Sequence, residues 1–294
     1  MGTARDLFAL TKPGITLFIV MVSVAGFFSV SPYPPDFRSL FFLIVSGGLG
    51  SAGSAALNQY FDRDIDRKMH RTSGRPIPME NLPPAVAFAF GIGLLALSLV
   101  SAYLLLNPAV ALAIASGAIV YVGLYTLWLK RRTPLGTVLG GYAGSAAVLG
   151  GGAAVAGTFP VPVLLLAVIV FLWTPPHFWS LAIALSTDFG RAELPALPNR
   201  SGAQGSARTV AISAGLLLPP TLTFALFGIS YLPFLLIAAT AGVVFFLTTT
   251  RTIRDPSRPV AMRAFIASGL YLVALSTAMI VNWLLLTVPW SHVG

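Results

Sequence analysis

Three polar residues at the end of an apolar segment have the types and spacing of a metal-binding group. Asn58, Asp62 and Asp66 follow a long, nearly uncharged run and are each four positions apart. At roughly 100° per residue, a step of four drifts only about 40° round a helix, so the three side chains share one face. Two stacked carboxylates repel each other unless a cation lies between them. Magnesium often binds one or two carboxylates together with phosphate oxygens. The spacing therefore predicts a site for a divalent cation and a phosphate.

The same segment has two other interpretations. Asp62, Asp64 and Asp66 begin like a calcium-binding EF-hand loop, but this chain lacks the Gly and the Glu that such a loop needs further on. Asp64 lies about 200° round the helix from Asp62, so we leave it out of the metal pair and expect it to pair with Arg67 or Lys68. The remaining alternative is a solvated helix end in which the carboxylates pair with neighbouring cations, Arg63, Arg67 and Lys68.

Further charged residues could reach the same site. Arg71 and Arg75 follow the motif, and guanidinium groups suit bidentate contact with phosphate. Lys130 and Arg131 end another apolar segment, where they are either interfacial anchors or contacts to the same phosphate. Asp188, at the end of a third apolar segment, is either a further metal carboxylate or part of a solvated loop.

One apolar segment contains the unusual string Trp173-Thr-Pro-Pro-His177-Phe-Trp179. We expect its two prolines to break or kink the helix, which membranes tolerate only where the backbone is buried or lines a cavity. His177 is the one histidine deep in an apolar segment, and the sequence favours a structural, hydrogen-bonded role. A neutral imidazole is also a common ligand of haem iron. Trp173 and Trp179 are then either interfacial residues or the flat wall of a porphyrin pocket.

The elements that position these residues are predicted membrane-spanning helices. The 294 residues are 56% apolar and only 9% charged, whereas a soluble domain has about 25% charged residues. The mean hydropathy is +0.85, and no alternating strand pattern appears. The absence of cysteine excludes disulfides and thiol chemistry. We predict an all-α polytopic membrane protein, a single domain over 1–294, with about nine spans near the ~20 residues that cross a bilayer: 14–32, 39–59, 84–105, 109–128, 136–157, 161–185, 209–229, 232–250 and 264–288.

The basic residues gather on one side of this topology. If the N-terminus and the even-numbered connections share a side, that side holds all but Arg38 of the 18 Lys and Arg residues. The positive-inside rule makes it cytoplasmic, with the C-terminus outside. The net charge of +9 therefore reflects topology and an anionic ligand rather than nucleic acid. The N-terminal segment lacks a clear cleavage site, which predicts a retained helix rather than a signal peptide.

The motif residues resemble a known family. Asn58-x3-Asp62-x3-Asp66 is similar to the first Asp-rich motif of the UbiA-type intramembrane prenyltransferases. The haem O synthase branch of that family, the protoheme IX farnesyltransferases, resembles this chain in longer strings from about residue 8 to 200, of which the fourth is the most specific: Leu10-Thr11-Lys12-Pro13, Met69-x-Arg71-Thr72-x2-Arg75-Pro76, Tyr125-Thr-Leu-Trp-Leu-Lys130-Arg131-Arg132-Thr-Pro134 and Trp173-Thr-Pro-Pro-His177-Phe-Trp179.

The resemblance implies a UbiA-like bundle of nine helices with a central cavity open to the cytoplasm. It implies transfer of a farnesyl group from farnesyl diphosphate to a vinyl group of haem b, which gives haem O and diphosphate. Haem b is then a substrate rather than a cofactor, and a haem A synthase is the downstream partner. Two alternatives stay open: another UbiA-type enzyme that prenylates a quinone precursor or a tetrapyrrole side chain, and a small-solute transporter. A transporter would more naturally carry its charges near the bilayer midplane.

The resemblance also assigns roles to residues. Mg²⁺ would be held by Asp62 and Asp66, with Asn58 assisting and Asp188 in the position of the second acidic motif. The diphosphate would contact five residues, Arg71, Arg75, Lys130, Arg131 and Tyr125. Haem b would contact His177, Trp173 and Trp179.

Overall fold

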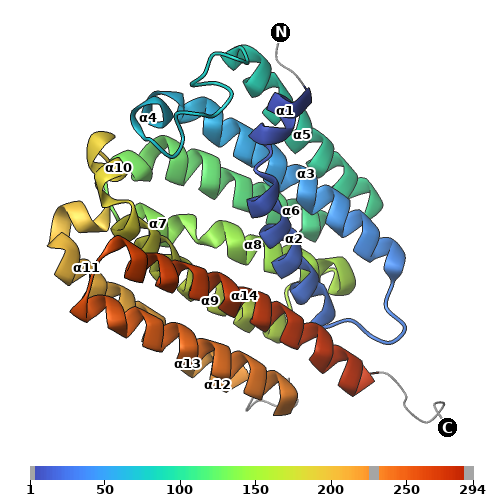
Figure 1. Cartoon of the computed structure of the whole chain (residues 1–294). Coiled ribbons are helices and arrows are strands. Elements are labelled where there is room, and N and C mark those ends of the chain that lie inside the picture. Colours follow the sequence, from blue (N-terminus) through green and yellow to red (C-terminus); the bar gives the residue numbers. More distant parts are fainter. Residues whose placement is uncertain (1–3, 225–231, 288–294) are drawn as a thin grey trace.

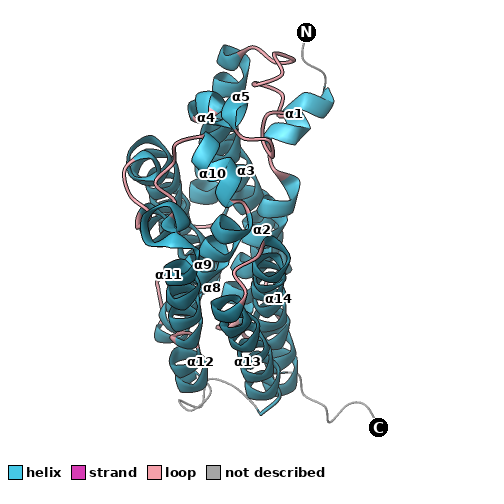
Figure 2. Ribbon diagram, turned by 60° about the vertical axis from the view of Figure 1, so that its left-hand side comes forward, coloured by secondary structure: helices cyan, strands magenta, loops and turns pink. Residues whose placement is uncertain are grey.

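The structure is a computed structural model that describes residues 4–224 and 232–287, and all regular elements in these ranges are helices (Figure 1). The all-α prediction is therefore confirmed. The long helices lie side by side in one bundle, which a second view also shows (Figure 2). In chain order the elements are α1 (Ala4–Leu10), α2 (Pro13–Phe28), α3 (Phe37–Phe61), α4 (Arg63–Lys68), α5 (Pro84–Leu105), α6 (Pro108–Ala118), η1 (Ile119–Trp128), η2 (Leu129–Arg131), α7 (Gly136–Gly140), α8 (Tyr142–Ala156), α9 (Val161–Ala184), α10 (Ser186–Arg191), α11 (Leu197–Gly215), α12 (Leu218–Phe224), α13 (Leu232–Arg254) and α14 (Arg258–Thr287).

The helices have the lengths of membrane spans. Within the described ranges, 7 helical stretches are long and apolar enough to cross a bilayer, and the bent pair of α1 and α2 raises the number to 8. This agrees with the predicted bundle of about nine. The difference lies at 209–229, where α11 ends at Gly215 and α12 begins at Leu218. Pro219 and Pro220 explain the division, because proline suits the first turn of a helix but not its interior. Residues 225–229 and 288 of the predicted spans lie outside the described residues.

The first span is bent at Lys12, between α1 and α2. α1 and α2 meet at 48°. Between them Lys12 adopts a left-handed conformation with φ 46° and ψ 64°, and Pro13 begins α2. A residue other than glycine keeps this conformation only where the surrounding structure holds it in place. The bend therefore fixes the Lys12 backbone at the end of the bundle where α3 also ends.

Close contact between α2 and α8 depends on glycine. The two helices pack together, and a Cβ added at Gly151 would overlap Ser23 O and lie 2.8 Å from Phe27 N. Small residues allow this kind of backbone approach between membrane helices. The contact continues into the largest buried cluster, in which α2, α8 and α9 meet the C-terminal helices through large side chains such as Phe224, Phe245 and Tyr271.

The helix with two prolines is not broken. α9 runs from Val161 to Ala184 with Pro175 and Pro176 in its interior, so of the two predicted effects, a break or a kink, the break does not occur. α9 packs against α8, α11 and α14. This packing on several sides holds the helix together although each proline removes one backbone hydrogen bond.

The fourth span ends in irregular helix. After α6, residues Ile119–Trp128 form π-helix η1, and Leu129–Arg131 form 3₁₀-helix η2. Such π-helical segments occur frequently at functional sites. Figures 1 and 2 both place α4 and α10 at the same end of the bundle. The bundle therefore gathers the predicted acidic segments at one end.

Candidate active site

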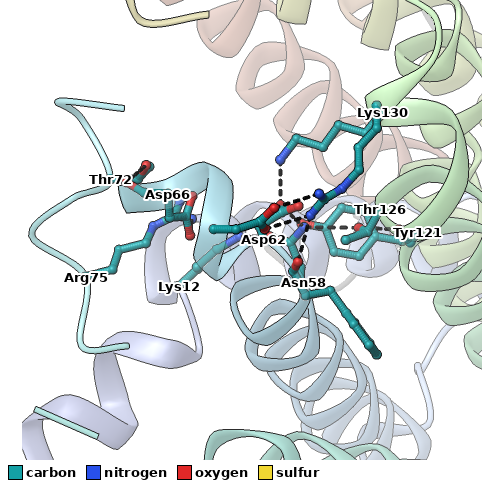
Figure 3. A network of polar contacts seen from close by, with 12 residues as sticks. Lys12, Asn58, Asp62, Asp66, Thr72, Arg75, Tyr121, Thr126 and Lys130 are labelled. Atoms are coloured by element: carbon teal, nitrogen blue, oxygen red, sulfur yellow. Dashed lines mark hydrogen bonds and ion pairs between the residues drawn. The ribbon is translucent and has the colours of Figure 1, made fainter. Parts of the chain in front are cut away.

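Asp62 forms the centre of a buried polar network (Figure 3). It lies at the junction of α3 and α4, and its side chain is 1% exposed. Lys130 Nζ lies 2.5 Å from Asp62 Oδ2, and Asn58 Nδ2 donates to the same oxygen at 2.7 Å. Asn58 also donates to Thr126 Oγ1 at 3.0 Å. The hydrogen bond between residues four apart confirms that Asn58 and Asp62 share a face.

Asp66 has a separate set of partners. Its side chain is 3% exposed and forms an ion pair with Arg75, with Nη1 2.6 Å from Asp66 Oδ2. The turn that carries Arg75 back is fixed by Thr72, whose hydroxyl donates to the backbone carbonyl of Asp66 at 3.1 Å. The Asp66 backbone N–H donates to Asp62 O at 2.8 Å, which keeps helical register across the junction. Asp62 and Asp66 are thus each paired with a separate cation, and neither pairs with Arg63, Arg67 or Lys68.

Lys12 joins this network and was not predicted as a site residue. Its Nζ donates to Asn58 Oδ1 at 2.5 Å. Figure 3 shows it beside Asp62 and Asp66, and its charge is within electrostatic reach of Arg75 and Lys130. A basic residue before an apolar run is typical of a topology signal, and the family-like string Leu10-Thr11-Lys12-Pro13 by itself assigned Lys12 no role in the site. Only the bend between α1 and α2 brings it to α3.

Arg131 and Asp64 pair with each other outside this network. Arg131 Nη1 and Nη2 contact the two Asp64 oxygens at 2.7 and 2.8 Å, and Nη2 also donates to Phe61 O at 3.0 Å. These hydrogen bonds hold the pKa of the Asp64 carboxyl below its usual value. The expected pairing of Asp64 with Arg67 or Lys68 is wrong, because Arg67 contacts Glu80 instead. Arg131, predicted to contact a diphosphate, is here bound to a carboxylate.

Asp188 on α10 connects to the first motif through Arg71. The buried Asp188 carboxylate accepts the Arg71 backbone N–H at 3.0 Å, and Arg191 lies 3.6 Å from its other oxygen. Loss of surrounding water lowers the pKa of the Arg71 guanidinium, and repulsion from Arg75 lowers it further. Asp66 and Asp188 act in the opposite direction, so Arg71 lies within electrostatic reach of both acidic segments.

The predicted metal ligands do not form one cluster. Over the part of the chain that the structure describes, no three His, Cys, Asp or Glu side chains come close enough together to hold a metal ion. One atom nevertheless lacks a partner: Asp62 Oδ1 is buried and accepts no hydrogen bond from the described residues. A buried carboxylate oxygen without a donor is costly, and a cation is a ligand that would satisfy it.

His177 is held between two aromatic rings. Its ring stacks on Trp173 at 4.3 Å and on Phe265 at 4.4 Å, measured between ring centroids. His177 Nδ1 and Ser268 Oγ are 2.5 Å apart, and Trp173 Nε1 donates to the backbone carbonyl of Ser268 at 2.8 Å. These contacts join α9 to α14 and provide a structural role. Any iron coordination by His177 would use Nε2.

Trp179 and Tyr125 are the remaining predicted site residues. Trp179 is buried in a cluster with Ile183 and Val210, and its Nε1 has no hydrogen-bond partner among the described residues. Tyr125 stacks on Tyr121 at 6.1 Å and lies within electrostatic reach of Lys130, Asp62 and Arg71. Tyr125 therefore adjoins the network around Asp62, whereas Trp179 is on another part of α9.

Comparison with known proteins decides the family. The sequence profile of the UbiA prenyltransferase family matches residues 19–276. The chain belongs to the UbiA prenyltransferase family. It is therefore an integral membrane prenyltransferase, which removes the alternative of a solute transporter.

Relatives within the family align with this chain over almost its whole length. Protoheme IX farnesyltransferase 1 of Paramagnetospirillum magneticum is 39% identical over 94% of this chain and 98% of that protein. The protoheme IX farnesyltransferase of Alcanivorax borkumensis is 38% identical over 97% of this chain and 95% of that protein. A solved structure, a UbiA homolog from Archaeoglobus fulgidus bound to DMAPP and Mg²⁺, has the same fold, with a TM-score of 0.72, 18% identity, and coverage of 94% of this chain and 99% of that one.

Proposed function

We propose that this UbiA prenyltransferase transfers the farnesyl group of farnesyl diphosphate to a vinyl group of haem b, giving haem O and diphosphate. The observation that carries the proposal is a buried cluster of two carboxylates and three cations at one end of an apolar bundle: Asp62, Asp66, Lys12, Arg75 and Lys130. The names of the relatives that are 38% and 39% identical support haem b as the acceptor.

The ion pairs of this cluster suit exchange with a metal diphosphate. Lys130 and Asp62 neutralise each other, as do Arg75 and Asp66. A magnesium diphosphate brings both signs of charge, so the carboxylates gain a cation when the lysine and the arginine turn to the phosphate oxygens. Guanidinium and ammonium groups both bind phosphate well. The exchange leaves no buried charge without a partner, which matters because such a charge destabilises a protein by several kcal/mol.

The donor atoms fit a magnesium ion. Asp62 and Asp66 would hold it, and the buried Asp62 Oδ1 that accepts no hydrogen bond from the described residues is available to it. A pair of carboxylates completed by phosphate oxygens is a common magnesium site. The bound Mg²⁺ of the Archaeoglobus fulgidus homolog supports the same assignment. When bound, the ion would stabilise negative charge on the departing diphosphate. Asp188 would position Arg71 for contact with the diphosphate, because its carboxylate already accepts the Arg71 backbone N–H.

The protein's own groups account for the rest of the reaction. As the allylic carbon–oxygen bond breaks, Lys130, Arg75 and Arg71 stabilise the charge that builds up on the diphosphate. Water is kept from the allylic cation, since the Asp62 and Asp66 side chains are 1% and 3% exposed. The haem vinyl group forms the new carbon–carbon bond. Water adds to the resulting porphyrin-stabilised cation and loses a proton. No side-chain nucleophile is needed.

The haem end of the site is assigned to the aromatic residues of α9. Trp173 and His177 form part of a continuous aromatic stack with Phe265, a surface that suits a flat macrocycle. His177 would ligate iron through Nε2, because Trp173 and Phe265 already stack on its ring. Trp179 lies farther along α9, and its indole N–H without a partner among the described residues is available to the ligand.

The orientation follows from the charge distribution. The end of the bundle that carries α4 and α10 also carries the basic connections, so we assign it to the cytoplasm together with the N-terminus. Both substrates would then enter from the cytoplasmic side or from the inner leaflet. A haem A synthase that oxidises haem O is the expected consumer of the product.

The competing acceptor within the family is a quinone precursor, and one assay separates the two. Purified protein is incubated with farnesyl diphosphate, Mg²⁺ and either haem b or hydroxybenzoate, and the products are identified by mass spectrometry. We expect a hydroxyethylfarnesyl haem from the first mixture and no prenylated product from the second. Prenylated hydroxybenzoate without haem O would overturn the proposed acceptor and leave the prenyl transfer intact.

A further inference from the structure

A cavity of about 600 Å³ opens at the same end of the bundle as the acidic segments. It lies between α9, α10, the start of α14 and the segment that follows α4. Its apolar side is formed by Leu181, Ala184, Leu185, Met262 and Phe265. Phe265 is also the outer ring of the stack that contains His177 and Trp173. The apolar side of the cavity is therefore continuous with an aromatic surface.

The polar side of the cavity is strongly basic. It carries the guanidinium groups of Arg71, Arg191 and Arg258 together with His70, against the single carboxylate of Asp188. Asp188 already accepts the Arg71 backbone N–H at 3.0 Å and lies 3.6 Å from Arg191. One carboxylate cannot neutralise three guanidiniums, so the rim favours an anionic ligand.

Arg258 has a position that fits this role. It is the first residue of α14, a helix of 30 residues, where the helix dipole adds positive potential. From the sequence, this arginine is predicted only to be a topology signal. In the fold it lines the cavity, as Arg191 on α10 also does. Both side chains belong to exposed residues, so they can turn toward a ligand without disturbing the packed core.

The geometry points to a carboxylate-binding rim for the acceptor: we propose that Arg191 and Arg258 are positioning residues that hold the carboxylate side chains of a flat, apolar acceptor whose ring lies over Phe265. The inference rests on the proposed function, in which the acceptor is haem b with its two propionate groups. Arginine binds carboxylates through paired, charge-assisted hydrogen bonds. Held at this rim, the ring lies beside Arg71, which borders the donor site.

The same charges could serve the diphosphate of the donor, and ligand esterification separates the two sources. The dimethyl ester of protohaem has the same macrocycle, but each anionic propionate is replaced by a neutral methyl ester. Each is titrated, without farnesyl diphosphate, into the purified full chain and into Arg191→Gln/Arg258→Gln, and binding is followed by haem absorption. We expect the wild type to prefer the free acid by about tenfold or more, and the double variant to lose most of this preference, because each charge-assisted contact contributes about a factor of ten.

Two further variants make the test specific. Arg263→Gln removes an exposed cation from the next turn of α14, outside the lining of the cavity, and is expected to keep the full preference. Arg191→Lys/Arg258→Lys keeps the charges and is expected to restore most of it. The KM for farnesyl diphosphate is measured in parallel and should stay within about twofold of the wild type, since a factor of two is less than 0.5 kcal/mol.

The outcomes distinguish a failure of the carboxylate rim from a failure of the proposed function. If the wild type binds haem and makes haem O, but the double variant keeps the preference for the free acid, the carboxylate rim is wrong and the proposed function stands. A raised KM for farnesyl diphosphate with an unchanged acid preference would assign the cavity to the diphosphate and also overturn the rim. If the wild type binds neither haem nor its ester, the proposed function and the rim fall together.

Discussion

Lys130 Nζ lies 2.5 Å from Asp62 Oδ2, where the Lys130 side chain is 17% exposed and the Asp62 side chain only 1%. The two residues come from different spans: Lys130 lies in η2, and Asp62 is the C-cap of α3. Their contact ties the fourth span to the first acidic motif. It also places an ammonium group where the charge of a departing diphosphate would develop.

Replacing Lys130 should affect both stability and catalysis. Lys130→Met keeps a chain of the same length as far as Cε but removes the ammonium group, which leaves the Asn58 amide as the donor to the buried Asp62 carboxylate. Removing one partner of a buried ion pair costs about 3 kcal/mol, so we expect a lower melting temperature in detergent. We also expect turnover to fall by about 100-fold, as for loss of one electrostatic contact in a transition state.

The matched control for this change is Arg132→Met. Arg132 is the neighbouring exposed cation and lies over the Trp128 ring at 5.7 Å. It should melt and turn over nearly as the wild type does. A Lys130→Met protein with the melting temperature and turnover of the wild type would show that the ion pair has neither role.

Metal removal should stop the reaction. If Asp62 and Asp66 hold Mg²⁺ with the diphosphate, dialysis against EDTA should abolish haem O formation, and added Mg²⁺ should restore it. Haem binding without farnesyl diphosphate should not change, because the aromatic stack around His177 is a separate part of the fold. Undiminished turnover in EDTA would contradict a metal site at these carboxylates.

Replacing His177 tests its assignment to haem. His177→Ala is expected to weaken haem b binding and to change its absorption spectrum, because it removes both the ring and a ligand atom. Ser268→Ala, which removes only the hydroxyl 2.5 Å from His177 Nδ1, should keep the spectrum of the wild type. If His177→Ala leaves affinity and spectrum unchanged, the histidine only joins α9 to α14.

A methyl group added at Gly151, where α8 contacts α2, should destabilise the protein. Gly151→Ala would push Cβ into Ser23 O and within 2.8 Å of Phe27 N, so the helices must separate. Overpacking of this kind typically costs about 1–3 kcal/mol, seen as a lower melting temperature. Gly93→Ala on α5 is the control, since nothing lies within 4 Å of its added Cβ. Equal melting temperatures for the two variants would refute the close approach.

The sequence predicts the class of fold well, because membrane spans depend on local properties. Length, apolar content and the cost of an unpaired backbone in lipid leave few alternatives to a helical bundle. Helical spacing likewise predicts the face shared by Asn58 and Asp62. The unbroken α9 and the divided 209–229 segment were not predictable in this way. In α9 neighbouring helices compensate for the prolines, whereas Pro219 and Pro220 begin a new helix.

The partners in the site depend on contacts far apart in the chain. Lys12 reaches Asn58 from α1–α2, and Lys130 reaches Asp62 from η2. Apart from the family resemblance, the local pattern of either lysine fits a topology signal as well as a site residue. The same holds for Arg131, which pairs with Asp64 on α4 although it follows Lys130 directly. Only the fold decides which adjacent cation faces the buried carboxylates.

The most direct measurement is mass spectrometry of the haems extracted from a host that lacks its own haem O synthase and expresses this chain. The wild type should produce haem O, and so should Asp64→Asn, because that carboxylate is 58% exposed and paired with Arg131. At equal levels in the membrane, Asp62→Asn and Asp66→Asn should produce none that is detectable. No haem O from the wild type, or undiminished haem O from both of the last two variants, would contradict the account.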